Sequence, residues 1–234
     1  NRAVARKLAA ESFVLLKNEG QLLPLQKKGK IALIGPLANT KANMAGTWCV
    51  AYTPDRYSTL KEGLERAVAG KAELLYAQGS NLTADEALQK AAEFGKTIPR
   101  GDDQKLKAEA LKIAKQSDVI IAAMGECADM SGESSSRSDL ELPDVQLSLL
   151  RELVATGKPV VLLNFSGRAT VMKWESEHVN AIMNVWFGGS EVGDALCDVI
   201  FGDKVPSGKL TTSMPKTTGQ EPLYYNHQNT GRPV

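Results

Sequence analysis

The chain has few of the residues from which cysteine or histidine sites are built. Its 234 residues include three cysteines and two histidines, and no two cysteines form a C-x-x-C pair. This pattern predicts no disulfide framework and no metal site. The net charge of +1 gives no field of one sign that would attract nucleic acid. Since no apolar run approaches membrane-spanning length, we expect neither a nucleic-acid partner nor a membrane span.

Three motifs that mark common α/β enzymes are also missing. The turn after the first buried strand reads Gly35-Pro36-Leu37-Ala38-Asn39 and lacks the second glycine of a dinucleotide-binding turn. No phosphate-cradling G-x-x-x-x-G-K-[ST] run is present. The serines after Glu133 lack the final glycine of a G-x-S-x-G elbow, and only His178 and His227 could assist them. We therefore expect no cofactor and no serine nucleophile.

Short apolar runs alternate with amphipathic stretches along the chain. This order is typical of an α/β three-layer sandwich, with a mostly parallel sheet and helices on both faces. We assign residues 1–219 to this sandwich domain and 220–234 to an extended tail that lies over a surface. Strands are expected at 30–36, 72–76, 119–124, 159–165, 181–187 and 209–214, and helices at 4–16, 59–69, 85–94, 104–116, 144–156 and 191–201.

One of these junctions between strand and loop is unusually polar. The run 119–124 is apolar at every position, as expected for a strand covered on both faces. The loop after it carries carboxylates, three successive serines and an arginine. Ligands of open parallel sheets bind beyond the carboxyl ends of the strands, so this loop is where we expect chemistry.

A carboxylate that works as a general acid is the chemistry that fits this loop. Retaining cleavage of a glycosidic bond takes two carboxyl groups about 5–5.5 Å apart, one nucleophilic and one that protonates the leaving oxygen. The candidates for the acid are Glu133 and Glu126, with Asp129 and Asp139 behind them. The sequence places no convincing second carboxylate beside them, which points to chemistry shared with another domain.

Ordered fragments along nearly the whole chain carry a specific resemblance. The chain is similar to the C-terminal α/β sandwich domain of glycoside hydrolase family 3, of the bacterial periplasmic β-glucosidase type. The resemblance rests on Glu11-Ser12-Phe13-Val14-Leu15-Leu16-Lys17-Asn18, Ala45-Gly46-Thr47-Trp48, Ser131-Gly132-Glu133-Ser134-Ser135-Ser136-Arg137, Leu140-Glu141-Leu142-Pro143, Trp186-Phe187-Gly188-Gly189-Ser190-Glu191 and Tyr224-Tyr225-Asn226-His227.

The resemblance implies an activity that this chain would share with a second domain. Members hydrolyse β-linked sugars from the non-reducing end with retention. Their nucleophilic aspartate lies on a preceding barrel-like domain, and the domain resembled here lends the acid/base glutamate. The implied location is periplasmic or secreted, the implied substrate is a β-glucoside, and the chain alone should be inactive. The alternative is a non-catalytic α/β module that binds carbohydrate or another small molecule.

The resemblance also implies roles for single residues. Glu133 matches the acid/base position of members that share Glu-x-x-x-Arg before a Leu-x-Leu-Pro stretch. Glu126 is its rival, because related subfamilies place their glutamate in a Gly-Glu pair. Trp48, Ser131 and Arg137 are candidate substrate contacts. Trp48 could instead lie at a domain interface, and Arg137 could instead fix the loop through an ion pair with Glu126 or Asp139.

Overall fold

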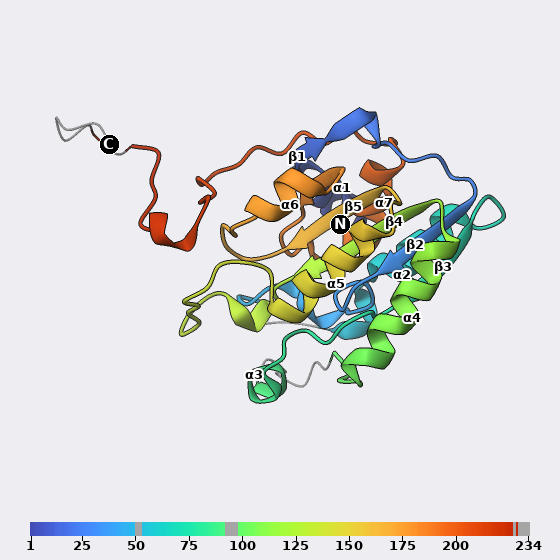
Figure 1. The fold of residues 1–234 in the computed structure, drawn as a ribbon. Helices are drawn as coiled ribbons and strands as arrows, with labels where there is room; N and C mark the ends of the chain where they lie inside the picture. Colours follow the sequence, from blue (N-terminus) through green and yellow to red (C-terminus); the bar gives the residue numbers. More distant parts are fainter. Residues whose placement is uncertain (50–52, 92–97, 227, 229–234) are drawn as a thin grey trace.

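The computed structural model describes residues 1–49, 53–91, 98–226 and 228 of the chain. These residues form a six-stranded sheet with the order β1-β6-β5-β4-β2-β3 (Figure 1). β1 pairs antiparallel with β6, and every other neighbouring pair is parallel. The mostly parallel sheet expected from the sequence is therefore confirmed. The strands are β1 (Val14–Asn18), β2 (Lys30–Ile34), β3 (Glu73–Ala77), β4 (Val119–Gly125), β5 (Val160–Phe165) and β6 (Ala181–Asn184).

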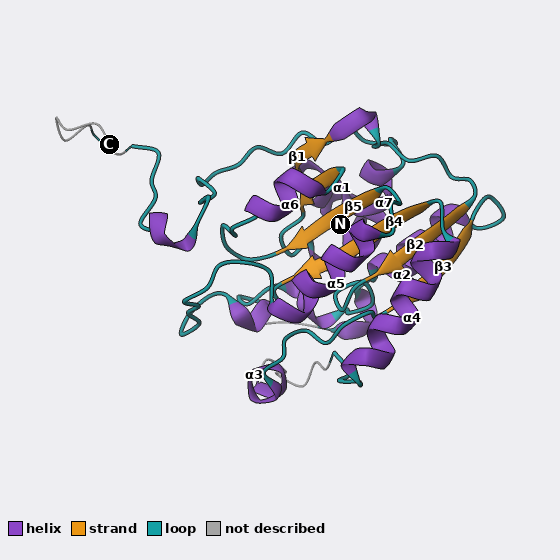
Figure 2. Ribbon diagram, viewed as in Figure 1, coloured by secondary structure: helices purple, strands orange, loops and turns teal. Residues whose placement is uncertain are grey.

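Helices cover both faces of the sheet and make it the middle of three layers (Figure 2). Successive side chains of a strand point to opposite faces, so Ile31 and Leu33 of β2 enter one core while Ala32 and Ile34 enter the other. The first core is closed by α1 (Arg2–Ser12), α2 (Leu60–Val68) and α7 (Val192–Ile200), and the second by α4 (Asp103–Gln116), α5 (Asp144–Ala155) and α6 (Lys173–His178).

The helices at 59–69, 104–116, 144–156 and 191–201 form within two residues of their expected bounds. The helix expected at 85–94 is α3 (Glu86–Ala91), and positions 92–94 lie outside the described residues. At the start of α2, Thr59 accepts a hydrogen bond from the Glu62 amide and Glu62 accepts one from the Thr59 amide. This reciprocal cap fixes the first turn. α6 was not predicted.

The helix expected at 4–16 is wrong in its second half. α1 ends at Ser12, Phe13 takes an extended backbone, and Val14–Asn18 pairs with β6 as the antiparallel edge of the sheet. The apolar spacing of this stretch fits a helix, but pairing with the open edge of β6 buries Val14 and supplies backbone hydrogen bonds. Tertiary pairing here overrides local preference.

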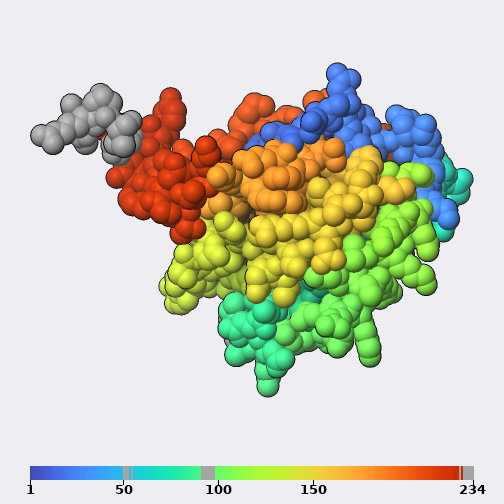
Figure 3. Space-filling model, in the orientation of Figure 1, coloured from blue at the N-terminus to red at the C-terminus, as the bar shows by residue number. Residues whose placement is uncertain are grey.

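The strand expected at 209–214 is also wrong. These residues have no strand partner among the described residues, although the Gly208 amide just before them donates to the Phe13 carbonyl at 3.2 Å. The following segment leaves the body of the molecule, and its described part is exposed at every position from 221 to 226 (Figure 3). The tail was expected to lie over a surface, but this part projects away from the rest of the chain. Within the described ranges, no helix is long and apolar enough to cross a membrane.

Candidate functional site

The polar loop begins where β4 passes very close to β5. Gly125 ends β4 with φ 135°, and a Cβ placed there would lie 1.9 Å from the Phe165 carbonyl oxygen. Only glycine fits this approach without moving the backbone. The amide of the next residue, Glu126, donates to the same carbonyl at 2.8 Å. The close contact therefore sets both the direction of the loop and the position of Glu126.

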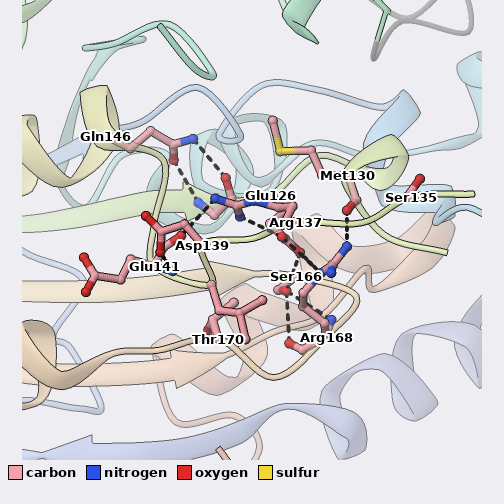
Figure 4. A network of polar contacts seen from close by, with 12 residues as sticks. Glu126, Met130, Ser135, Arg137, Asp139, Glu141, Gln146, Ser166, Arg168 and Thr170 are labelled. Carbon is pink, nitrogen blue, oxygen red and sulfur yellow. Dashed lines mark hydrogen bonds and ion pairs between the residues drawn. The ribbon is translucent and has the colours of Figure 1, made fainter. Parts of the chain in front are cut away.

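The carboxylate of Glu126 is buried in a polar network (Figure 4). Its side chain is 1% exposed and lies 2.7 Å from Nη1 of Arg137 and 3.2 Å from Nε of Arg168. The Ser166 hydroxyl donates to its Oε2 at 2.8 Å. A buried carboxylate held by two guanidinium groups and a hydroxyl has no open face for a substrate. This arrangement fits a charge that organises the loop.

Both arginines that hold Glu126 also hold backbone carbonyls of the loop. Arg137 donates from Nη2 to the Glu141 carbonyl at 3.2 Å, and Arg168 donates from Nη2 to the Met130 carbonyl. Arg137 is thus in the ion pair with Glu126 that was considered as an alternative to sugar contact. The network ties the start, the middle and the end of the loop to one buried group.

A second set of contacts holds the loop from the side of the turn that carries Trp48. The Thr47 hydroxyl lies 2.5 Å from the Ala128 carbonyl and 2.6 Å from the Ser131 carbonyl. The side-chain Oδ1 of Asn43 accepts from the Ala128 amide at 3.0 Å. The stem of the loop is therefore fixed from two sides.

Glu133 lies at the exposed tip of this fixed loop. Gly132 and Ser134 on either side of it have φ of 107° and 61°, and the Ser135 amide donates back to the Gly132 carbonyl at 3.2 Å. The tip is a tight turn that points Glu133 away from the core, and this residue is exposed. Its carboxylate makes no hydrogen bond or ion pair with another described residue. The two glutamates thus have opposite environments.

Beside the loop tip lies a cleft of about 430 Å³. Trp48, which is 70% exposed, lines it together with Ser131, Trp186 and Phe187. Gly132 also lines the cleft, so Glu133 follows at its margin. The structure brings Trp48 and Ser131 together here, whereas Arg137 is not among the lining residues. Indole and phenyl faces beside hydroxyl groups are suited to a sugar ring.

Sequence reasoning gave no role to two members of the network. Ser166 and Arg168 follow β5, the strand next to β4. A signal was present, because polar residues that follow neighbouring parallel strands meet at one edge of the sheet.

A buried glutamine bridges the loops at the place that α/β folds commonly use for small ligands. β2 and β4 are neighbours in the sheet. From β2 the chain goes on to β3 at one edge, and from β4 it goes on to β5, toward the other edge. Gln146 of α5 accepts from the Gly125 amide at 2.8 Å and donates to the Leu82 carbonyl at 2.7 Å. β2 lies between β4 and β3 in the sheet. The buried Gln146 side chain therefore links the loop after β4 to the loop after β3, across the end of β2.

His178 makes no hydrogen bond with the serines of the loop among the described residues. His178 stacks on Trp174 with ring centroids 4.5 Å apart, and its Nδ1 lies 2.8 Å from the Trp174 carbonyl oxygen. His227 lies outside the described residues. Among the residues that the structure covers, no group of three or more His, Cys, Asp or Glu side chains could hold a metal ion.

Comparisons with known proteins place this domain in a family. The model of the glycosyl hydrolase family 3 C-terminal domain matches residues 13–234. A periplasmic β-glucosidase of Salmonella typhimurium is 44% identical over 100% of this chain and 31% of that protein. A β-xylosidase of Formosa agariphila is 34% identical over 96% of this chain and 30% of that protein.

Solved structures show the same relationship. A β-glucosidase from Listeria innocua, in complex with isofagomine, is similar with a TM-score of 0.84 and 35% identity, over 100% of this chain and 30% of that one. This chain therefore spans a little under a third of the length of the relatives it matches. Its sequence match and its three-layer fold together show that the chain belongs to the glycosyl hydrolase family 3 C-terminal domain family.

Proposed function

We propose that this chain is the second domain of a retaining β-glucosidase and that Glu133 is its acid/base residue. The observation that carries the proposal is the contrast between the two glutamates of one loop. Glu126 is buried and held by two arginines, whereas Glu133 is exposed at the tip of a loop whose stem is fixed. A residue that must reach a sugar held by another domain needs an exposed position of this kind.

The partner carboxylate of the reaction comes from outside this chain. Retention requires a nucleophilic carboxylate about 5–5.5 Å from the acid. Glu126 is the other candidate glutamate of this loop, but its oxygens are occupied by Arg137, Arg168 and Ser166. An N-terminal barrel domain of the same polypeptide supplies the nucleophile in this proposal. The length of the relatives supports it, since each is about three times as long as the part that this chain matches.

The substrate of the whole protein is a non-reducing terminal β-glucoside in this proposal. Two relatives are named β-glucosidases, one of them periplasmic, which supports this substrate and a periplasmic or secreted location. Trp48 and Ser131 contact the substrate, or the surface of the barrel next to it, from the cleft beside Glu133. The same cleft would also serve the alternative, a non-catalytic module that binds carbohydrate, but that alternative gives no role to the exposed Glu133 beside it.

The test is the dependence of the rate on the leaving group in the full-length protein. A general acid matters most when the leaving group is poor, so Glu133→Ala should slow cellobiose hydrolysis by about 10²–10⁴-fold. The kcat/KM for dinitrophenyl glucoside, which reports glycosylation, should fall far less because that group departs without a proton, whereas its kcat should fall because deglycosylation loses the general base. The basic limb of the profile of kcat/KM against pH should disappear. If Glu133→Ala lowered kcat/KM equally for both substrates, Glu133 would not be the general acid, and Glu126 would again be the candidate.

A further inference from the structure

Arg168 occupies a position that neither the resemblance nor the proposed reaction explains. It follows β5, outside the loop that carries Glu133, yet it reaches two parts of that loop at once. Its Nε lies 3.2 Å from the Glu126 carboxylate, and its Nη2 donates to the Met130 carbonyl (Figure 4). Met130 lies three positions before Glu133. Arg168 therefore links the buried start of the loop to the segment that leads into its tip.

The backbone of Arg168 is itself held by the Ser166 side chain. The Ser166 hydroxyl accepts from the Arg168 amide at 3.1 Å, lies 3.0 Å from the Arg168 carbonyl oxygen and donates to Glu126 at 2.8 Å. The Arg168 guanidinium thus contacts the Glu126 carboxylate directly, and the Arg168 backbone is linked to the same carboxylate through the Ser166 hydroxyl. A planar guanidinium held in this way has little freedom to follow a moving loop.

Arg137 makes the matching contact at the far end of the loop. It joins Glu126 to the Glu141 carbonyl, so that one carboxylate, through two arginines, holds backbone groups on both sides of Glu133. Between these two points the tip of the loop is exposed. The tip is closed by contacts within the loop, from the Ser135 amide to the Gly132 carbonyl and from the Ser135 hydroxyl to the Asp129 carbonyl at 2.9 Å, so the place of the Glu133 carboxylate depends on the stem that carries this turn.

We propose that Arg168 is a positioning residue for Glu133, and that it acts through the Glu126 carboxylate and the Met130 carbonyl to set where the loop tip lies. The proposal rests on the acid/base role of Glu133 proposed above. Arg168 touches no reacting atom in this account. Its loss should therefore weaken proton donation without removing the acid.

The experiment combines Arg168 variants with Glu133→Ala in the full-length protein. Arg168→Met removes both contacts, and we expect it to slow cellobiose hydrolysis by about 10²-fold, the typical effect of misplacing a catalytic group by about 1 Å. Dinitrophenyl glucoside should be slowed much less. The basic limb of the pH profile should remain, since Glu133 is still present. In the Glu133→Ala background, Arg168→Met should cause no further loss on cellobiose.

A second variant and a matched control separate positioning from a general loss of stability. Arg168→Lys keeps the charge but cannot bridge both groups, so its rates should fall between those of the wild type and Arg168→Met. It also replaces Arg168→Met in the comparison if that variant does not fold. The control is Arg6→Met, which breaks a two-bond ion pair with Asp198 at 2.7 and 2.5 Å, away from the loop. It should slow both substrates by the same factor, if at all.

Two results would overturn the proposal. One is equal slowing of cellobiose and dinitrophenyl glucoside by the Arg168 variants. The other is a further loss on cellobiose when Arg168→Met is added to Glu133→Ala. Either result leaves the role of Glu133 intact as long as Glu133→Ala alone shows dependence on the leaving group. If Glu133→Ala alone lacks that dependence, the proposed function fails instead.

Discussion

Glu175 of α6 is a buried carboxylate that the fold compensates only in part. The residue is 2% exposed, and its Oε1 has no hydrogen-bond partner among the described residues. Burial raises the pKa of Glu175 above its ordinary value of 4.5, and the nearby charge of Glu141 works in the same direction. A backbone hydrogen bond and Arg151 oppose the shift without cancelling it. The raised pKa means that the folded state binds this proton more tightly than the unfolded state does.

This preference predicts how stability changes with pH. Because the pKa is higher in the folded state, the protonated carboxyl costs nothing below pH 4.5, and a penalty develops as the pH rises through the folded-state pKa. Glu175→Gln, which is neutral at every pH, should raise Tm at pH 7 and lose most of that gain at pH 4. Thermal unfolding at the two pH values measures this, with Glu177→Gln at an exposed position of the same helix as control. An equal gain at both pH values would contradict it.

The candidate site was predictable residue by residue only in part. Glu126 and Glu133 could be singled out because polar residues follow an apolar strand. Their different environments could not, because Ser166 and Arg168 lie 40 and 42 positions after Glu126 and meet it only through the pairing of β4 with β5. Sequence distance hides a contact that the register of two strands creates.

At the scale of elements, α2 and α7 pack closely through two glycines. A Cβ added to Gly63 of α2 would lie 2.4 Å from the Gly193 carbonyl oxygen, and one added to Gly193 would lie 2.1 Å from the Thr59 carbonyl oxygen. Backbone is in contact with backbone here, so neither helix can yield by rotating a side chain. The absence of two side chains thus brings α7 onto the first turn of α2.

This packing reverses the usual effect of replacing a helical glycine. Glycine to alanine within a helix ordinarily stabilises by about 0.5–1 kcal/mol. Gly63→Ala should instead destabilise by about 1–3 kcal/mol, as overpacking does, which denaturant unfolding would measure. Gly219→Ala is the control, since its Cβ would meet nothing nearer than 4.0 Å. An unchanged or higher stability for Gly63→Ala would show that the two helices separate easily.

The strands buried on both sides and the edge strand β3 were predicted well, whereas the opposite edge of the sheet, at β1, was predicted poorly. β2, β4 and β5 are nearly all apolar, and their positions matched the expectation. The edge strand β1 was taken for the end of a helix, and the segment 209–214 was taken for a strand. An edge strand pairs with one neighbour only. Which segment of the chain takes that place depends on competition between segments far apart in the sequence, and the local sequence does not show its outcome.

At the scale of the whole molecule, the described residues form their own hydrophobic cores, whereas the proposed chemistry is shared with another domain. Two hydrophobic cores lie on the two faces of one sheet, and the loops after β4 and β5 meet at one edge. We predict that the chain alone melts cooperatively and releases no nitrophenol from aryl β-glucosides. Turnover by the chain alone that is abolished by Glu133→Gln would mean that a complete active site lies within these residues.

The most direct test of the account is azide rescue of Glu133→Ala in the full-length protein. Azide attacks a glycosyl-enzyme intermediate without needing a general base, so it should restore part of the rate on dinitrophenyl glucoside. The account predicts β-configured glucosyl azide as the product, since two inversions give net retention. No rescue, or an azide product of α configuration, would contradict the claim that Glu133 is the acid/base of a retaining enzyme.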